Sequence, residues 1–486
     1  MPASIAHMLI AREARKRLLT DGNPKVAEFA ADVLGKHPHY MELGSLGPDL
    51  PYFGWRSLLD SNKPRGVDHW SYQLHSKCPN VFPLQMIELV WRESDPTKTD
   101  WEDHDKCKLS FLCGYLTHMA ADQVIHPLVN VIAGGPYDER QDVRTRHRDC
   151  EIHQDLYLLS RQNRKPLTRS QFTSESFNSW CNPKLDGWST SKLSEGSVIG
   201  RILDALWMAK KKMYPPPCPL EFIYFLQRAF VEAHAVTPKE EWVEHRIKSL
   251  KTGLLLGKYW PWSWYNIARQ ALFADDGSLK KDSDAYMNFI HLRQLPKKQE
   301  GSYDDYVDEA NELATVYIRA AYELSRAPRL DDDLRKAFRE VVVNADLGVP
   351  LELHILRTAK ENCPRLTILV EHKWAIKWLE DLDQGHYVES WDAAAESWKS
   401  VLTKDDFVNS MKLNREPMGK VISRKQKRTN GETTKTLPVV GDCMTIQCET
   451  SFVNGATAVE AMTVVLDENE SWKVSDYKIS PAIPGK

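Results

Sequence analysis

Residues 114–127 read GYLTHMAADQVIHP, and the polar residues of this stretch recur at a fixed interval. His118, Asp122 and His126 are each four residues apart in a largely apolar segment. Four residues along an α-helix turn the side chain by about 40° and advance it by about 6 Å. The stretch therefore predicts an apolar helix that carries two imidazoles and a carboxylate on one side.

This line of polar residues is too long for one ion. His118 and His126 would span only about 80° of arc but about 12 Å along the helix axis, so they cannot comfortably bind the same metal. Imidazole nitrogens and carboxylate oxygens are ligands that zinc accepts. The spacing favours two or three metals in a row, with Asp122 in the middle and able to bridge.

A second pair of the same kind lies in RHRDCEIHQD, residues 146–155. It places His147 and Glu151 at positions i and i+4, on one face of a helix. A single histidine on an apolar helix is usually a hydrogen-bonded core residue, but two matched groups are hard to obtain by chance. Ten of the 16 histidines also fall in the first third of the chain, at 7, 37, 39, 69, 75, 104, 118, 126, 147 and 153. The pattern predicts a metal centre, with further donors at His7, Asp49 and His69.

Composition restricts the class of protein. The chain has 486 residues, 42% hydrophobic and 27% charged, which is ordinary for a soluble globular protein of two or three domains. The net charge of −3 lacks the basic footprint of a dedicated nucleic-acid binder. Nine scattered cysteines with no C-x-x-C pair favour reduced thiols.

The N-terminal residues lack the basic start, apolar core and cleavage site of a secretory signal. No apolar run approaches the roughly 18 residues of a membrane-spanning helix. We therefore expect a cytoplasmic protein with no transmembrane segment.

The pattern of elements divides the chain near residue 360. Apolar residues at helical spacing predict helices at 3–20, 24–35, 82–92, 105–132, 145–162, 195–213, 219–235, 239–255, 261–273 and 303–326. After about residue 366, two helical stretches are followed by alternating, strand-like runs with turn signals such as Asn430-Gly431 and Asn454-Gly455. The predicted fold is mainly α: a helical domain over 1–360, then a small α+β domain over 361–486 with a curled antiparallel sheet.

Several motifs together resemble the zinc-dependent phospholipase C family. They are His7 followed by IAREA, GSLGPDLPYF at 44–53, DHW at 68–70, HMAADQVIHP at 118–127 and H-x-x-x-E at 147–151. The four-residue step from Asp122 to His126 is most similar to the branch that includes the catalytic domain of glycosylphosphatidylinositol-specific phospholipase D. The resemblance covers roughly residues 1–160 by motif, and extends to about 330 by helical character.

The resemblance implies a helical fold around three zinc ions and assigns their ligands. Asp49, His69, His118 and Asp122 would bind one ion, with His126, His147 and Glu151 at a second and His7 with Asp122 at a third. His75 and His153 lie near enough to replace His69 and His147. His69 is preferred for its family-like His-Trp, and His147 for its i+4 carboxylate.

The third zinc of such relatives also uses the amino group of the mature N-terminal residue. Removal of Met1 would leave Pro2 five residues before His7, which matches the family's spacing. We therefore hypothesise that the Pro2 nitrogen is a zinc ligand, and an intact Met1 in fully active, three-zinc protein would refute this.

The expected function is zinc-dependent phosphodiester hydrolysis. The resemblance implies a phospholipase C/D-type enzyme of lipid metabolism, acting on a phospholipid or lipid-linked phosphodiester with two to three zinc ions. Asp49 is the candidate to orient or deprotonate the attacking water. The alternatives are a zinc-dependent nuclease or soluble-substrate phosphodiesterase, and a non-catalytic scaffold stabilised by metal.

Two other segments bear on partners. The aromatic run KYWPWSWY, residues 258–265, suggests either peripheral membrane contact or, more simply, aromatic packing at a helix start. Residues from about 378 onward resemble a bacterial family of unknown function, on WLEDLDQGHYVESWDAAAESW, REPMGKVISR and SWKVSDYKI. Trp378, Tyr387 and Trp391 should pack its helix on the sheet. We expect this domain to bind a ligand or partner, or to form an oligomer, rather than to catalyse.

Overall fold

The computed structural model describes residues 4–49, 74–76, 79–94, 101–135, 140–163, 264–292, 302–345, 354–433, 442–466 and 472–481. The chain forms two compact units. The first contains residues 1–21, 26–325 and 335–364, and the second contains 22–25, 326–334 and 365–486. The helices expected at 195–213, 219–235 and 239–255 lie outside the described residues, as does most of 258–265.

Secondary structure before residue 354 is helical within the described ranges, apart from one isolated bridge between Phe273 and Leu279. The elements are α1 (Ser4–Leu18), α2 (Pro24–Phe29), the π-helix η1 (Ala30–Leu34), α3 (Pro38–Gly44), α6 (Val81–Glu93), α7 (Asp103–Ala133), α8 (Gln141–Asn163), α14 (Trp264–Leu272), α15 (Asp284–Phe289), α16 (Tyr303–Ser325) and α17 (Asp332–Val341). None of the helices in these ranges has the length and apolar character needed to cross a membrane.

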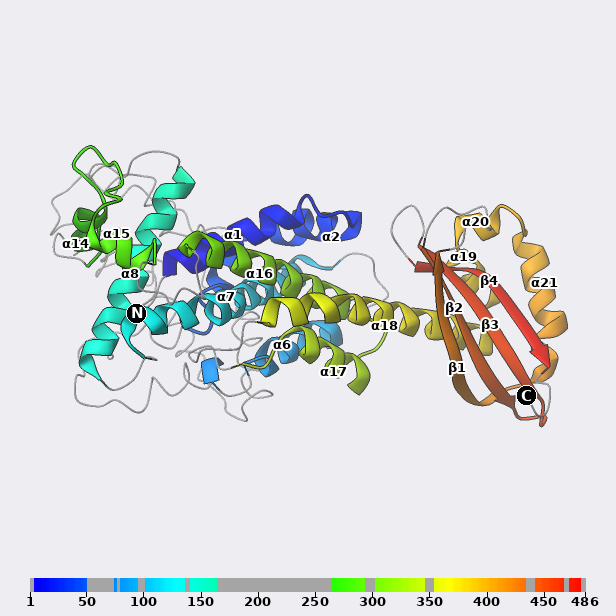
Figure 1. The fold of residues 1–486 in the computed structure, drawn as a ribbon. Coiled ribbons are helices and arrows are strands. Elements are labelled where there is room, and N and C mark those ends of the chain that lie inside the picture. The colour runs from blue at the N-terminus through cyan, green and yellow to red at the C-terminus, as the bar shows by residue number, and fades with distance from the viewer. Residues whose placement is uncertain are drawn as a thin grey trace, which may run out of the picture. The chain divides into compact units, whose positions relative to one another are not determined.

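Helix α7 is the central element of the first unit (Figure 1). It packs against α1, α3, α6, α8 and α16, and every residue from Leu109 to Ile125 is buried. The helix ends at Gly134, whose φ of 86° is the left-handed conformation that favours glycine. Pro127 lies inside the helix one residue after His126.

Two glycines allow α3 to lie directly on α7. A Cβ atom at Gly44 would lie 1.9 Å from the carbonyl oxygen of Phe111, and one at Gly114 would lie 1.9 Å from that of Met41. Only residues without a Cβ permit backbones to approach this closely. Gly114, the first residue of the stretch GYLTHMAADQVIHP, therefore sets the distance between the two helices.

The second unit is a helical layer on a four-stranded sheet. Its elements are the part of α18 (Ile355–Asp383) from residue 365 onward, α19 (Tyr387–Asp392), α20 (Glu396–Lys399), α21 (Lys404–Asn414), the 3₁₀ turn η4 (Glu416–Met418), β1 (Val421–Thr433), β2 (Asp442–Phe452), β3 (Thr457–Leu466) and β4 (Trp472–Pro481). The strands are antiparallel in the order β1-β2-β3-β4. This confirms the mainly helical fold with a C-terminal antiparallel sheet.

The expectation of a curled sheet is wrong. Strong curvature needs bulges or glycine kinks in the middle of a sheet. The central strands β2 and β3 instead pair over nine consecutive residues without a register shift, from Cys443 opposite Val465 to Ser451 opposite Thr457. The shifts occur in the outer pairs, two between β1 and β2 and one between β3 and β4.

An aromatic core joins the helices to the sheet. Trp378, Tyr387 and Trp391 are all buried in it, together with Trp398 and Phe407. The rings of Trp391 and Phe407 lie 5.3 Å apart, and Trp378 approaches the ring of Tyr477 on β4 to 5.6 Å. Large aromatic side chains supply most of the apolar area that a small domain can bury.

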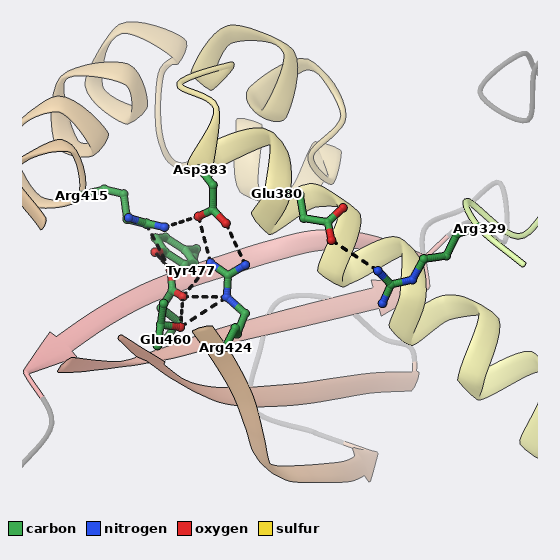
Figure 2. Close-up of polar contacts among 8 residues, drawn as sticks. Arg329, Glu380, Asp383, Arg415, Arg424, Glu460 and Tyr477 are labelled. Atoms are coloured by element: carbon green, nitrogen blue, oxygen red, sulfur yellow. Dashed lines mark hydrogen bonds and ion pairs between the residues drawn. The ribbon is translucent and has the colours of Figure 1, made fainter. Parts of the chain in front are cut away.

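A buried polar network interrupts this core between Asp383 and the sheet (Figure 2). Arg424 donates hydrogen bonds of 2.9 Å to both Asp383 and Glu460, and Arg415 pairs with the same two carboxylates. Tyr477 donates to Glu460 over 2.6 Å. Two cations and two carboxylates balance the charge, as the cost of burying ions requires.

Protonation of Glu460 in acid should destabilise the second unit. Burial alone would raise the pKa of this carboxyl, but Arg424 and the hydrogen bonds from Thr450 and Tyr477 outweigh burial and hold the pKa below 4.5. A carboxyl whose pKa is lower in the folded state stabilises the fold at any pH above the ordinary pKa of the group. This contribution is lost as the pH falls from the ordinary pKa through the lower folded-state pKa. Deuterium exchange of peptides from 442–466, corrected for its intrinsic pH dependence, should show falling protection below about pH 4.5. Constant protection from pH 6 to 3 would contradict this.

Candidate metal centre

Asp122 lies at the centre of a buried cluster of imidazoles. Its Oδ2 is 3.1 Å from Nε2 of His118 and 3.6 Å from Nε2 of His75. Its Oδ1 is 3.3 Å from Nε2 of His7 and 3.5 Å from Nε2 of His126. Each carboxylate oxygen thus faces two ring nitrogens, and the helical line on α7 brings His118 and His126 to opposite oxygens of one side chain.

A hydrogen bond from the ring nitrogen that faces away from Asp122 fixes the orientation of His118. Its Nδ1–H donates to the Ser45 carbonyl over 2.8 Å, and Ser45 follows the end of α3. This bond leaves the lone pair of Nε2 facing Asp122 and His75, whose Nε2 lies 3.3 Å away. Metal-binding histidines commonly donate their other ring N–H to such a carbonyl.

The second group joins α7 to α8. Nε2 of His147 and Nε2 of His126 lie 3.0 Å and 3.4 Å from the same Glu151 oxygen. These three residues can present donor atoms within 4.8 Å of one another, as can His7 with His118 and Asp122. His118 and His126, the two histidines on α7, thus belong to different groups of donors.

Asp49 joins the cluster from the loop after α3. It is buried, and its Oδ1 lies 3.4 Å from Nε2 of His75. Asp49, His75 and His118 form a further group of donors within 4.8 Å. The expected partner His69 lies outside the described residues, so its role stays a prediction, as does that of Pro2. His153 donates to the Asp149 carbonyl instead and contacts the ring of Phe289.

Three contacts of the cluster have the spacing of ligands that share one ion, whereas the His118–Asp122 and His147–Glu151 contacts, at 3.1 and 3.0 Å, have the spacing of hydrogen bonds. Zinc–ligand bonds of about 2.0–2.3 Å place tetrahedral donors about 3.3–3.8 Å apart. The contacts of His7 and His126 with Asp122 and of His75 with Asp49, at 3.3, 3.5 and 3.4 Å, fall in this range. Among the described residues, none donates a hydrogen bond to either oxygen of Asp49 or to Oδ2 of Asp122. Buried carboxylates seldom lack hydrogen bonds, so these residues fit a divalent cation.

Asp122 raises the pKa of His118 in spite of its burial, but the protonation states of His7 and of the two central carboxylates agree with this fit. Burial and, after it, the neighbouring His118 lower the pKa of His7 to about 4, so the His7 imidazole is neutral at pH 7. Burial works to raise the pKa of Asp122 and of Glu151, but the surrounding imidazoles prevail and lower both. Neutral imidazoles and ionised carboxylates are the forms that bind metals.

Asp155 positions the helix that carries His7. It lies on α8, one turn after Glu151, and accepts hydrogen bonds from the backbone N–H groups of Ala6 and Ile5 over 2.8 and 3.3 Å. These groups belong to the first turn of α1, where N–H groups lack helical partners. Ser45 and Asp155 escape sequence reasoning because both act through the backbone of a distant segment.

Replacing Asp155 with alanine should therefore release the start of α1 and weaken the site at His7. We expect the protein to lose about one zinc equivalent, and kcat/KM to fall about tenfold or more, as for other supporting residues. Asp155→Asn keeps an acceptor oxygen and should retain more of both. Zinc content by mass spectrometry separates this role from a general loss of fold, and equal zinc in the alanine variant and wild type would exclude it.

A helical domain with a buried, multi-donor metal centre is the class that this fold and site define. Comparison with known families agrees: residues 6–195 match the family model described as zinc dependent phospholipase C. Residues 6–195 are thus identified as a zinc-dependent phospholipase C domain, and the family of that domain is one of hydrolases. Residues 374–477 match a protein of unknown function, DUF4019. No curated protein and no solved structure matches the chain.

Proposed function

We propose that this chain hydrolyses a phosphodiester bond of a phospholipid or lipid-linked phosphodiester. The proposal rests on the position of Asp122. Its two oxygens face His7 and His118 of one donor group and His126 of the other. The family implies the phospholipid. The finer relationship to the glycosylphosphatidylinositol-specific phospholipase D branch rests on the Asp122–His126 step. A cytoplasmic location stays part of the proposal, supported by the buried thiols of Cys113 and Cys150.

In this proposal the ligands divide among two or three ions. His118 and Asp122 with Asp49 and either His69 or His75 would hold one zinc, His126, His147 and Glu151 a second, and His7 with Asp122 a third. Bound zinc supplies Lewis-acid chemistry that activates water and withdraws charge from the phosphoryl oxygens.

Asp49 would orient the attacking water. Its pKa is lowered, because the histidines around it prevail over burial, so the carboxylate stays ionised at neutral pH. Its Oδ2 accepts no hydrogen bond from described residues and is available to a water proton. A low pKa makes Asp49 a weak base, so holding the water in line for attack is its first role, and accepting the proton its second.

A panel of substrates tests the proposal. Zinc-loaded protein should hydrolyse phosphatidylcholine vesicles, lose this activity with a chelator, and recover it with Zn²⁺. Phosphocholine among the products indicates C-type cleavage, and free choline indicates D-type cleavage. Faster hydrolysis of single-stranded DNA or of bis-p-nitrophenyl phosphate would favour the nuclease or soluble-substrate alternative. Less than one zinc per chain would overturn the metal centre itself.

A further inference from the structure

A second cluster of metal-binding side chains lies at the other end of α7. His37 precedes α3, and Asp103 and Cys107 lie one turn apart at the start of α7. These three residues can present donor atoms within 4.8 Å of one another. Cys107 and His118 are eleven residues apart on one helix, which is about 16 Å. The cluster is therefore separate from the centre around Asp122.

His37 faces the other two side chains through different ring nitrogens. Its Nδ1 lies 3.3 Å from Sγ of Cys107, and its Nε2 lies 3.1 Å from Oδ1 of Asp103. The histidine is only 6% exposed, yet its Nε2 makes no hydrogen bond with any residue that the structure describes, despite the nearby carboxylate. A buried ring nitrogen in this state needs an explanation, and binding of a cation is one that the surrounding donors support.

The backbone holds His37 in place before any ion binds. Ser110 on α7 donates its hydroxyl to the His37 carbonyl over 2.7 Å, and both residues are buried. The neighbouring lysines are occupied elsewhere, because Lys36 and Lys106 both pair with Asp32. Asp103 is 86% exposed on its side chain, so it can move to complete a coordination shell.

We propose that His37, Asp103 and Cys107 form a peripheral site for a soft or borderline divalent cation such as Zn²⁺. Thiolate and imidazole select such ions over Mg²⁺ or Ca²⁺, and one carboxylate completes three protein ligands. The ion would connect the start of α3 to the first turn of α7. Ser45 directly follows α3 and His118 lies on α7, so the proposed role of the ion is structural, and it does not depend on the proposed reaction.

Cobalt(II) provides a direct test, because only a thiolate gives a cobalt–sulfur charge-transfer absorption. The donors around Asp122 are imidazoles and carboxylates, so cobalt bound there gives no such signal. Reduced full-length protein loaded with Co²⁺ should show the absorption, and Cys107→Ser should abolish it. The matched variant Cys363→Ser should leave it unchanged.

A second variant keeps the proposal testable if Cys107→Ser fails to fold. Asp103→Asn changes an exposed side chain and should preserve the fold, while raising the Kd for Co²⁺ at this site by about tenfold or more. The proposed site would be overturned if the wild type showed no thiolate absorption at saturating Co²⁺. It would also be overturned if Cys107→Ser kept the absorption. Phospholipid hydrolysis by the zinc-loaded protein is measured separately, so failure here leaves the proposed function standing.

Discussion

Replacement of Asp122 by asparagine should lower kcat/KM for phosphodiester hydrolysis by more than about a hundredfold, which exceeds the usual effect of removing a supporting residue. The change keeps the shape of the side chain but removes the anion that faces four imidazoles. One of its two oxygens becomes an NH₂ group, which cannot bind a metal. We therefore expect the loss of at least one zinc equivalent together with the activity.

The matched control is Asp142→Asn, which removes an exposed carboxylate from the first turn of α8. It changes the net charge by the same amount and should leave zinc content and hydrolysis unchanged. Zinc content and initial rates are measured on the same preparations. Full activity and full zinc in Asp122→Asn would mean that the centre does not lie on this residue.

Sequence reasoning reached the parts of the site that lie on single helices. The i, i+4 spacing alone places His118, Asp122 and His126 on one face, and the same rule joins His147 to Glu151. Helical geometry is local, so no knowledge of the fold is needed. The zinc-dependent phospholipase C domain and the C-terminal module were also within reach, because their motifs are short and ordered along the chain.

Contacts between distant segments were beyond the same reasoning. Asp155 meets the first turn of α1 about 150 residues away, and His75 reaches Asp49 and Asp122 from a segment with no helical pattern of ligands. His37 and Cys107 are likewise brought together only by the packing of α3 on α7. The curl of the sheet depends on where register shifts fall, and alternation of polar and apolar residues does not indicate this.

Gly114→Ala should strongly destabilise the protein, because this glycine lies where α3 packs on α7. In an ordinary helix this change would stabilise the protein by up to about 1 kcal/mol, because alanine is the better helix former. Here the new Cβ would lie 1.9 Å from the Met41 carbonyl oxygen and 2.8 Å from the Ser45 nitrogen. These are backbone atoms that cannot rotate away, so we expect a loss of about 3 kcal/mol, at the upper end of overpacking effects.

The same clash should reach the metal centre. The Ser45 N–H donates to the Met41 carbonyl over 2.9 Å, and the Ser45 carbonyl accepts from His118. Pushing α3 away from α7 therefore moves the acceptor that orients His118, and zinc affinity should fall together with the free energy of unfolding. Gly22→Ala is the control, because a Cβ there meets nothing within 4 Å, and its effect should stay within about 0.5 kcal/mol. Urea unfolding and zinc titration measure the two effects, and a stabilised Gly114→Ala variant would show that the helices do not meet at this glycine.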